Sequence, residues 1–203
     1  MDSIEPQQWG GQARTRQSCP FHFDQNAPFH LYMSKPFITS QQIKRVTDCN
    51  SGHPGKDFTF DGAHWSNAYM PYPNMDFGTP VYAMEPGTVL WVQEGKPLCI
   101  NDPKCEPNSV AIQSADRVVT EYVHVTPWVK KGQQVNTGDF IATLAPSGNF
   151  NVQPGGKPLP HLHINRITTP GNSVCEHIFS CNWAIVGADF PSWYFNPFHH
   201  HHR

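Results

Sequence analysis

Two histidines separated by one residue, His161 and His163, are the strongest candidates for chemistry in this sequence. They belong to residues 158–166, a short segment with the composition of a β-strand. Because side chains alternate between the faces of a strand, both imidazoles should share one face, while Leu162 and Ile164 should share the other. Paired imidazoles on one side of a sheet can bind a metal ion or transfer a proton. The alternative is a solvated sheet face, so a functional site needs further partners.

Three other residues are candidates to complete such a site. His64 follows an alternating segment and an Asp-Gly turn, Asp76 ends the polar and aromatic loop that begins there, and His124 falls within a β segment. A catalytic zinc site uses three imidazole or carboxylate ligands and leaves one position open for water. Further imidazoles nearby can move a proton and stabilise an oxyanion. Spacing alone does not separate the ligands from the helpers among these five residues.

Composition and charge exclude several classes of function. The 203 residues carry 14 Lys and Arg against 16 Asp and Glu, a net charge of −2, and no basic stripe, so nucleic acid is not an expected partner. No apolar run approaches the ~20 residues of a membrane span. The 20 prolines, the 15 glycines and the short apolar segments predict a turn-rich, mostly β protein.

Alternating apolar residues bounded by turn formers predict β-strands at residues 78–83, 87–92, 110–114 and 117–125. The first two are joined by a Pro-Gly turn, and the last two should form a hairpin. Within the last segment, alternation places Tyr122 and His124 on one face and Glu121 and Val123 on the other.

Six cysteines favour an oxidising compartment, so the protein is expected to be secreted or periplasmic. None belongs to a C-x-x-C pair, which argues against a cysteine zinc site. Proximity in the sequence predicts the disulfides Cys99–Cys105, Cys175–Cys181 and Cys19–Cys49.

We expect one domain with two extensions. Residues 1–45 would be an N-terminal arm, 46–169 the core, and 170–198 an aromatic, disulfide-bearing cover. Residues 199–203, four histidines and an arginine, are typical of a purification tag and are left out of the site. The first residues have neither the basic start nor the apolar segment of a signal peptide.

The order of motifs over residues 60–166 resembles the LytM/lysostaphin-type zinc endopeptidases of bacterial cell-wall lysis. The motifs are His64, Asp76, Gly-Thr-Pro-Val-Tyr-Ala, Gly-Thr-Val, Tyr122-Val-His124, Gly-Gln-Gln-Val-Asn-Thr-Gly, Ser-Gly-Asn and His161-Leu-His163. The wide gap between His64 and Asp76 is most similar to the β-lytic, LasA-like branch. In the lysostaphin-like branch the corresponding ligands are only three residues apart.

This resemblance implies an all-β fold, a compact antiparallel β-sheet or sandwich with a narrow groove, of the lysostaphin-type (duplicated hybrid motif-like) peptidase class. It implies that His64, Asp76 and His163 bind Zn²⁺ and that His124 and His161 are the catalytic pair, as general base and oxyanion stabiliser in either order. The implied reaction is cleavage of peptide bonds in the cross-links or cross-bridges of peptidoglycan. The protein would act as a monomer, and an inhibitory pro-segment or immunity protein is compatible with this function.

A second pair of residues fits the short form of the first ligand motif, because His53-Pro-Gly-Lys-Asp57 has the pattern His-x-Gly-x-Asp. We prefer His64 and Asp76, because Asp76 leads directly into Gly-Thr-Pro-Val-Tyr-Ala, where the family places this ligand. Asp57 comes much earlier in the chain.

Two other functions compete with this interpretation. The glycine-rich β segments also resemble biotinyl or lipoyl carrier domains, but the turn after Ala83 has no acceptor lysine. A catalytically inert family member could bind cell-wall peptide or activate another hydrolase. Such members usually lack one or more of the five site residues, whereas all five are present here.

Overall fold

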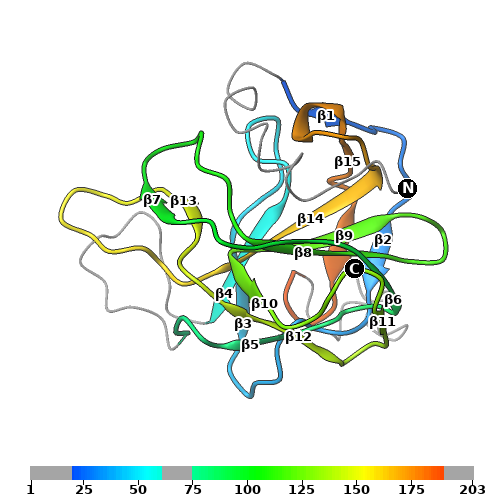
Figure 1. Cartoon of the computed structure of the whole chain (residues 1–203), viewed down its shortest axis with the longest axis horizontal. Helices are drawn as coiled ribbons and strands as arrows, with labels where there is room; N and C mark the ends of the chain where they lie inside the picture. The colour runs from blue at the N-terminus through cyan, green and yellow to red at the C-terminus, as the bar shows by residue number, and fades with distance from the viewer. Residues whose placement is uncertain (1–19, 61–74, 190–203) are drawn as a thin grey trace, which may run out of the picture.

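The structure of the chain is a computed structural model that describes residues 20–60 and 75–189 (Figure 1). Strands form nearly all of the regular structure in these residues, with a short 3-10 helix at Val174–Glu176. The predicted all-β fold is therefore confirmed. In the part of the chain that the structure describes, no helix has the length and apolar character that a membrane span requires.

The largest sheet has nine strands. Seven of them are neighbours in the order β1 (His22–Phe23), β15 (Ile178–Phe179), β14 (Leu162–Thr169), β9 (Val119–Val123), β8 (Ser109–Gln113), β6 (Gly87–Gln93) and β11 (Gln134–Val135). The other two are β4 (Lys56–Phe60), which also pairs with β14, and β3 (Ile43–Thr47), which pairs with β4. Neighbours are antiparallel except β1 and β15. The predicted hairpin is confirmed as β8 and β9.

Three smaller sheets complete the described fold. They are the antiparallel sheet of β10 (Val125–Pro127), β12 (Phe140–Leu144) and β5 (Pro80–Tyr82), the parallel pair β13 (Gly148–Phe150) and β7 (Leu98–Ile100), and the parallel pair β16 (Trp183–Ile185) and β2 (His30–Tyr32). The consecutive strands β5 and β6 lie in different sheets, since β5 pairs with β12 and β6 pairs with β8.

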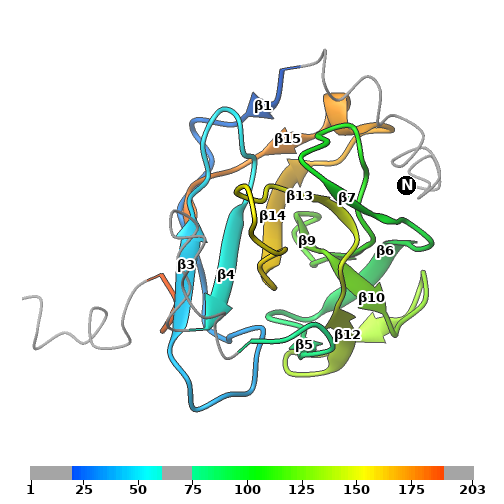
Figure 2. The same ribbon diagram turned by 90° about the vertical axis from the view of Figure 1, so that its left-hand side faces the viewer.

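Strand register sorts the residues of β14 between two faces of the large sheet. Ile164 is opposite Tyr122 of β9, and both lie in the main hydrophobic core. His163 is opposite Val123 of β9 and Asp57 of β4. Because opposite residues of antiparallel strands share a face, His163 and Asp57 lie together on the face that points away from this core. The site thus follows directly from the pairing of β4, β14 and β9, which are side by side in Figures 1 and 2.

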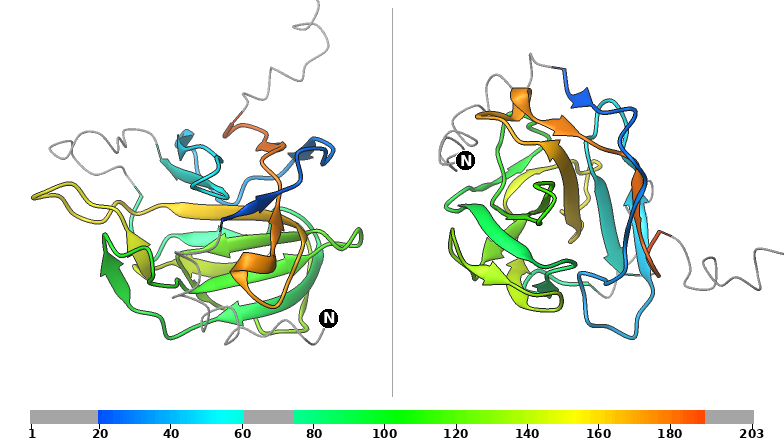
Figure 3. Two further views of the ribbon diagram at one scale, coloured as in Figure 1. Left: turned by 90° about the horizontal axis from the view of Figure 1, so that it is seen from above. Right: turned by 90° about the vertical axis from the view of Figure 1, so that its right-hand side faces the viewer.

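The described N- and C-terminal segments lie side by side, as β1 pairs with β15 and β2 with β16 (Figure 3). A disulfide joins Cys49 to Cys181, with Cα atoms 5.4 Å apart. The predicted bonds of these two residues to Cys19 and Cys175 are therefore wrong, because strand pairing unites cysteines that are distant in sequence. Cys175 is also disulfide-bonded. The predicted disulfide within residues 99–105 is confirmed.

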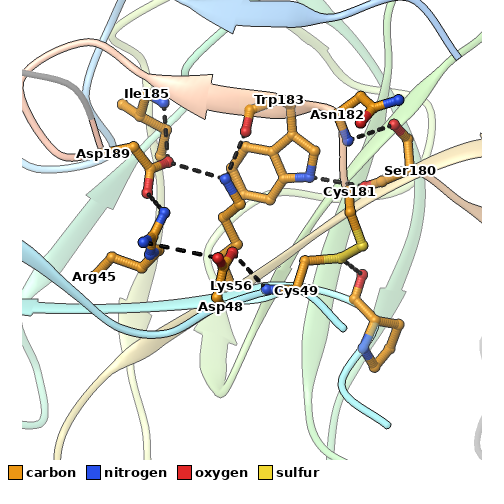
Figure 4. A network of polar contacts seen from close by, with 11 residues as sticks. Arg45, Asp48, Cys49, Lys56, Ser180, Cys181, Asn182, Trp183, Ile185 and Asp189 are labelled. Carbon is orange, nitrogen blue, oxygen red and sulfur yellow. Dashed lines mark hydrogen bonds and ion pairs between the residues drawn. A yellow bond between two sulfur atoms is a disulfide. The ribbon is translucent and has the colours of Figure 1, made fainter. Parts of the chain in front are cut away.

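A buried polar network holds the end of the described chain against β4 (Figure 4). The Nζ of Lys56 donates to the backbone oxygen of Trp183 at 2.6 Å and lies 3.5 Å from a carboxylate oxygen of Asp189. Arg45 of β3 donates to the same carboxylate at 3.1 Å. Burial lowers the pKa of Lys56, and the charge of Asp189 offsets part of this effect. Because Asp57 is the next residue along β4, this network also fixes the strand that carries it.

Candidate active site

A groove of about 630 Å³ lies on the face of β14 that points away from the main core. Four imidazoles and one carboxylate are among the side chains that line it: His53, Asp57, His124, His161 and His163. The structure therefore brings three of the five predicted residues together with the alternative first pair. As predicted, Leu162 and Ile164 point to the opposite side, into the core.

Asp57 stands at the centre of a compact group of potential metal ligands. Its Oδ1 lies 2.9 Å from Nδ1 of His163, and its Oδ2 lies 3.1 Å from Nε2 of His53. One potential ligand atom from each of the three residues lies within 4.8 Å of the others. Over residues 20–60 and 75–189, this is the group of histidine, cysteine and acidic residues whose geometry suits a metal ion.

In its neutral form, His53 directs a lone pair at this group. Its Nδ1 lies 2.7 Å from the backbone oxygen of Gly55. A carbonyl oxygen can only accept, so the ring donates there, and Nε2 of the neutral ring carries no proton. Nε2 then faces an oxygen of Asp57, which is also an acceptor. Two acceptors 3.1 Å apart require a cation or a second proton between them.

His163 presents the same situation from the other side. Its Nε2 lies 2.6 Å from Oδ1 of Asn165, so this nitrogen carries the proton, and Nδ1 directs a lone pair at Asp57. Burial lowers the pKa of His163, and contact with Asp57 offsets only part of that shift, so the ring is neutral at pH 7. Two imidazole nitrogens and one carboxylate form the donor set of a catalytic zinc site. The residues present fit zinc.

Asp57 remains ionised in spite of its burial. Burial alone would raise the pKa of the Asp57 carboxyl group, but its interactions with His161, His53 and His163 hold that pKa well below its usual range. In turn, burial lowers the pKa of His53, and the charge of Asp57 outweighs this and raises it overall. A permanent negative charge thus lies at the floor of the groove, where a cation is favoured.

His124 and His161 form a second pair beside this group, with ring centroids 4.9 Å apart. Nδ1 of His124 donates to the backbone oxygen of Ser147 at 2.6 Å, and Nδ1 of His161 donates to that of Leu159 at 2.7 Å. Nε2 is therefore the nitrogen with the lone pair in each neutral ring. Burial and the neighbouring His161 and His163 keep the pKa of His124 well below its usual value, so this ring is neutral. Phe150 packs against both rings of the pair.

The orientation of His124 differs from the expected alternation. Tyr122 lies in the core, where its hydroxyl accepts a hydrogen bond from the backbone of Met84. His124 has a φ of +66°, in the left-handed region, and lies between the ends of β9 and β10. This conformation breaks the two-residue period, so the imidazole lines the groove rather than sharing the face of Tyr122. The prediction of a common face for these two residues is wrong.

Of the preferred first ligand pair, Asp76 takes no part in the observed group. His64 lies outside the described residues. Asp76 is exposed, and its backbone oxygen accepts hydrogen bonds from the backbone and hydroxyl of Thr79. The ligand set of His64, Asp76 and His163 therefore stays a prediction. The observed geometry favours Asp57 instead, because register on β14 sets that residue directly opposite His163.

The signal for this alternative pair was visible in the short His-x-Gly-x-Asp motif. Other residues near His163 had no such signal. Asn165 and Glu121 are buried next to it, and the sequence gives no reason to associate them with a site.

A model of peptidase family M23 matches residues 73–174, half of the chain. The chain belongs to peptidase family M23. The resemblance drawn from the motifs is thereby confirmed at the level of the family, and the LasA-like branch remains a prediction. The matched part of this M23 member includes His124, His161 and His163 as well as Asp76, and it begins after His53 and Asp57.

Several solved structures are similar to this M23 member. Lysostaphin from Staphylococcus simulans is 21% identical with a TM-score of 0.41, over 66% of this chain and 50% of lysostaphin. A zinc-containing peptidase from Vibrio cholerae is 20% identical with a TM-score of 0.41, over 81% and 41% of the two chains. A putative glycyl-glycine endopeptidase LytM from Ruminococcus gnavus is 18% identical with a TM-score of 0.43, over 84% and 61%. The chain thus spans less than two thirds of each of these proteins. No curated protein matches it.

Proposed function

We propose that this chain is a zinc-dependent endopeptidase that cleaves peptide bonds in bacterial peptidoglycan. The observation that carries the proposal is the meeting of two sets of residues in one groove. His53, Asp57 and His163 form a metal-ligand group, and His124 and His161 form a pair of anchored imidazoles beside it. Membership of family M23 supplies the reaction class, and the resemblance to cell-wall enzymes supplies the substrate.

The metal would be held by His53 through Nε2, by His163 through Nδ1 and by the carboxylate of Asp57. A zinc ion bound in this way lowers the pKa of a bound water to ~7 and polarises a carbonyl oxygen. The ring N–H of His53 is hydrogen-bonded to Gly55, and that of His163 to Asn165, on the sides that face away from the metal position. The lone pairs of both rings therefore point to that position. The protein thus arranges the ligands before the ion arrives.

His124 and His161 would move the proton and stabilise developing charge. Each ring is anchored through Nδ1 to a backbone oxygen, so Nε2 accepts the proton of the attacking water in one of them. The other, once protonated at Nε2, donates to the developing oxyanion or to the leaving amine. Packing of Phe150 on both rings restricts their rotation. Such fixed orientation lowers the reorganisation needed in the transition state.

The far wall of the groove suits an extended peptide. Asn149 and Phe150 of β13 belong to this wall. The pairing of β13 with β7, the disulfide of residues 99–105 and the two hydrogen bonds between the Asn101 side chain and the Val152 backbone brace it. Side-chain amides of Asn149, Asn151 and Gln153 line this wall and can pair with peptide groups. The disulfides also support the proposed secreted or periplasmic location.

The proposal is tested by product analysis. The zinc-loaded protein is incubated with purified peptidoglycan, and soluble products are identified by mass spectrometry. We expect new peptide termini that disappear with a chelator and return with added zinc. Products that persist at full yield under chelation would contradict the metal-dependent mechanism. Binding of peptidoglycan by the zinc-loaded protein without any new termini would instead identify an inert, peptide-binding member of the family.

A further inference from the structure

We propose that Asn165 and Glu121 are positioning residues that fix the proton and orientation of His163 for metal binding. The inference rests on the proposed role of His163 as a ligand. This role is common to the group of potential ligands in the structure and to the ligand set implied by the motif order. The three side chains form one chain of hydrogen bonds across the neighbouring strands β14 and β9.

The geometry of this chain is close and continuous. Nε2 of His163 donates to Oδ1 of Asn165 at 2.6 Å, and Nδ2 of Asn165 donates to Oε1 of Glu121 at 2.8 Å. Asn165 is opposite Glu121 in the register of β14 and β9, and it is two residues from His163 on the same strand. All three side chains therefore project from one face of the sheet, so their contact follows from strand pairing rather than from a mobile loop.

The hydrogen bond to Glu121 sets the orientation of the Asn165 amide. Oε1 of Glu121 accepts from Nδ2 of Asn165, so the amide turns its NH₂ group towards Glu121 and its oxygen towards His163. That oxygen in turn needs a proton on Nε2. The neutral ring of His163 is thus held as the Nε2–H tautomer, with its lone pair on Nδ1, the nitrogen that faces Asp57. Without the acceptor oxygen that Glu121 presents, the amide could reverse and favour the tautomer with no lone pair on Nδ1.

Because Asn165 and Glu121 are buried, water does not replace them as hydrogen-bond partners. Asn165 is 4% exposed, and Glu121 is fully buried. Gly55 packs closely against this pair. A Cβ added to it would lie 2.4 Å from Oδ1 of Asn165 and 2.6 Å from Nε2 of His163, which is too close for any side chain. Only glycine therefore fits at position 55, where the chain passes this pair just before β4 begins. The hydrogen bond between His163 and Asn165 is therefore buried, on the side of the ring opposite to the contact between Nδ1 and Asp57.

The function of such an outer pair is to raise affinity for the metal ion. Residues that orient ligating histidines typically contribute 10–100-fold to metal affinity or activity. Asn165 also lines the groove, but in this role Asn165 and Glu121 act through His163. Substitution of either residue should therefore change the affinity for zinc, and any change in the rate of the chemical step should follow from that change in affinity.

The test compares Glu121→Gln and Asn165→Ala with Thr120→Val. Thr120 adjoins Glu121 on β9 but faces the other way, and its hydroxyl contacts the hydroxyl of Tyr32 at 2.8 Å. Loss of this buried contact lowers stability without touching His163. Zinc affinity of the full chain is measured by competition with a chelator of known affinity, and thermal unfolding is measured in parallel. ¹⁵N NMR of the His163 ring, before zinc is added, reports its tautomer.

We expect about 10–100-fold weaker zinc binding in Glu121→Gln and Asn165→Ala, and a shift of the His163 ring away from the Nε2–H form in Glu121→Gln. Thr120→Val should bind zinc as the wild type does, even if it melts earlier. Wild-type zinc affinity and an unchanged tautomer in Glu121→Gln, a substitution that keeps the shape of the side chain, would overturn the inference. If the wild-type protein itself binds no zinc, the proposed function fails, and this result is distinct from a failure confined to the variants.

Discussion

Asp57→Asn is expected to weaken zinc binding by more than ~100-fold and to remove peptidase activity with it. The expected loss exceeds the 10–100-fold typical of residues that only orient ligands, because Asp57 would itself be a ligand. It also supplies the only carboxylate in the group with His53 and His163. The asparagine keeps the size of the side chain, so packing in β4 should be retained while the negative charge is lost.

The matched control for this prediction is Asp76→Asn. Asp76 is exposed and lies outside the group at His163, so its variant should keep wild-type zinc affinity and activity. Both variants are compared by zinc competition and by release of peptides from peptidoglycan. Intact zinc binding in Asp57→Asn together with its loss in Asp76→Asn would contradict the proposed ligand group and support the one that the motif order implies.

His124→Ala is expected to lower kcat by about 10²–10⁴-fold while zinc content stays unchanged. The ring is anchored to Ser147 and lies beside His161, but it does not belong to the metal-ligand group. His161→Ala should have a similar effect. The double variant should lose little more than either single variant, because residues that act together in one step are not additive.

Zinc content and rate, measured on the same samples, decide this second prediction. His22→Ala is the matched control, because His22 is an exposed histidine on β1 and its loss should change neither quantity. A His124→Ala variant that retains full activity would remove this residue from the mechanism. Loss of zinc in parallel with activity would make it a ligand rather than a proton carrier.

Local patterns in the sequence predicted the parts of the site that depend on strand alternation and motif order. The spacing of His161 and His163 placed both rings on one side of a strand, with Leu162 and Ile164 in the core, as the structure shows. The order of motifs identified the family, and the short alternating segments identified an all-β fold. These features depend on neighbours within a few residues, which a single sequence displays directly.

Features that depend on long-range pairing were not predictable in this way. The choice of Asp57 as the neighbour of His163 follows from the register between β4 and β14, and the Cys49–Cys181 disulfide follows from the way the two ends of the chain meet. The left-handed backbone at His124 interrupts a strand pattern that looks regular in the sequence. Neither the register between distant strands nor a single unusual φ angle produces a periodic pattern in the sequence.

The most direct test of the account is the zinc content of His53→Ala and His64→Ala. Both variants should be prepared without residues 199–203, because consecutive histidines bind metal themselves. Zinc per chain is then measured by elemental analysis after equal dialysis. We expect His53→Ala to lose the ion and His64→Ala to retain it at the wild-type level. Retention of zinc by His53→Ala, together with its loss from His64→Ala, would contradict the assignment of the metal to His53, Asp57 and His163.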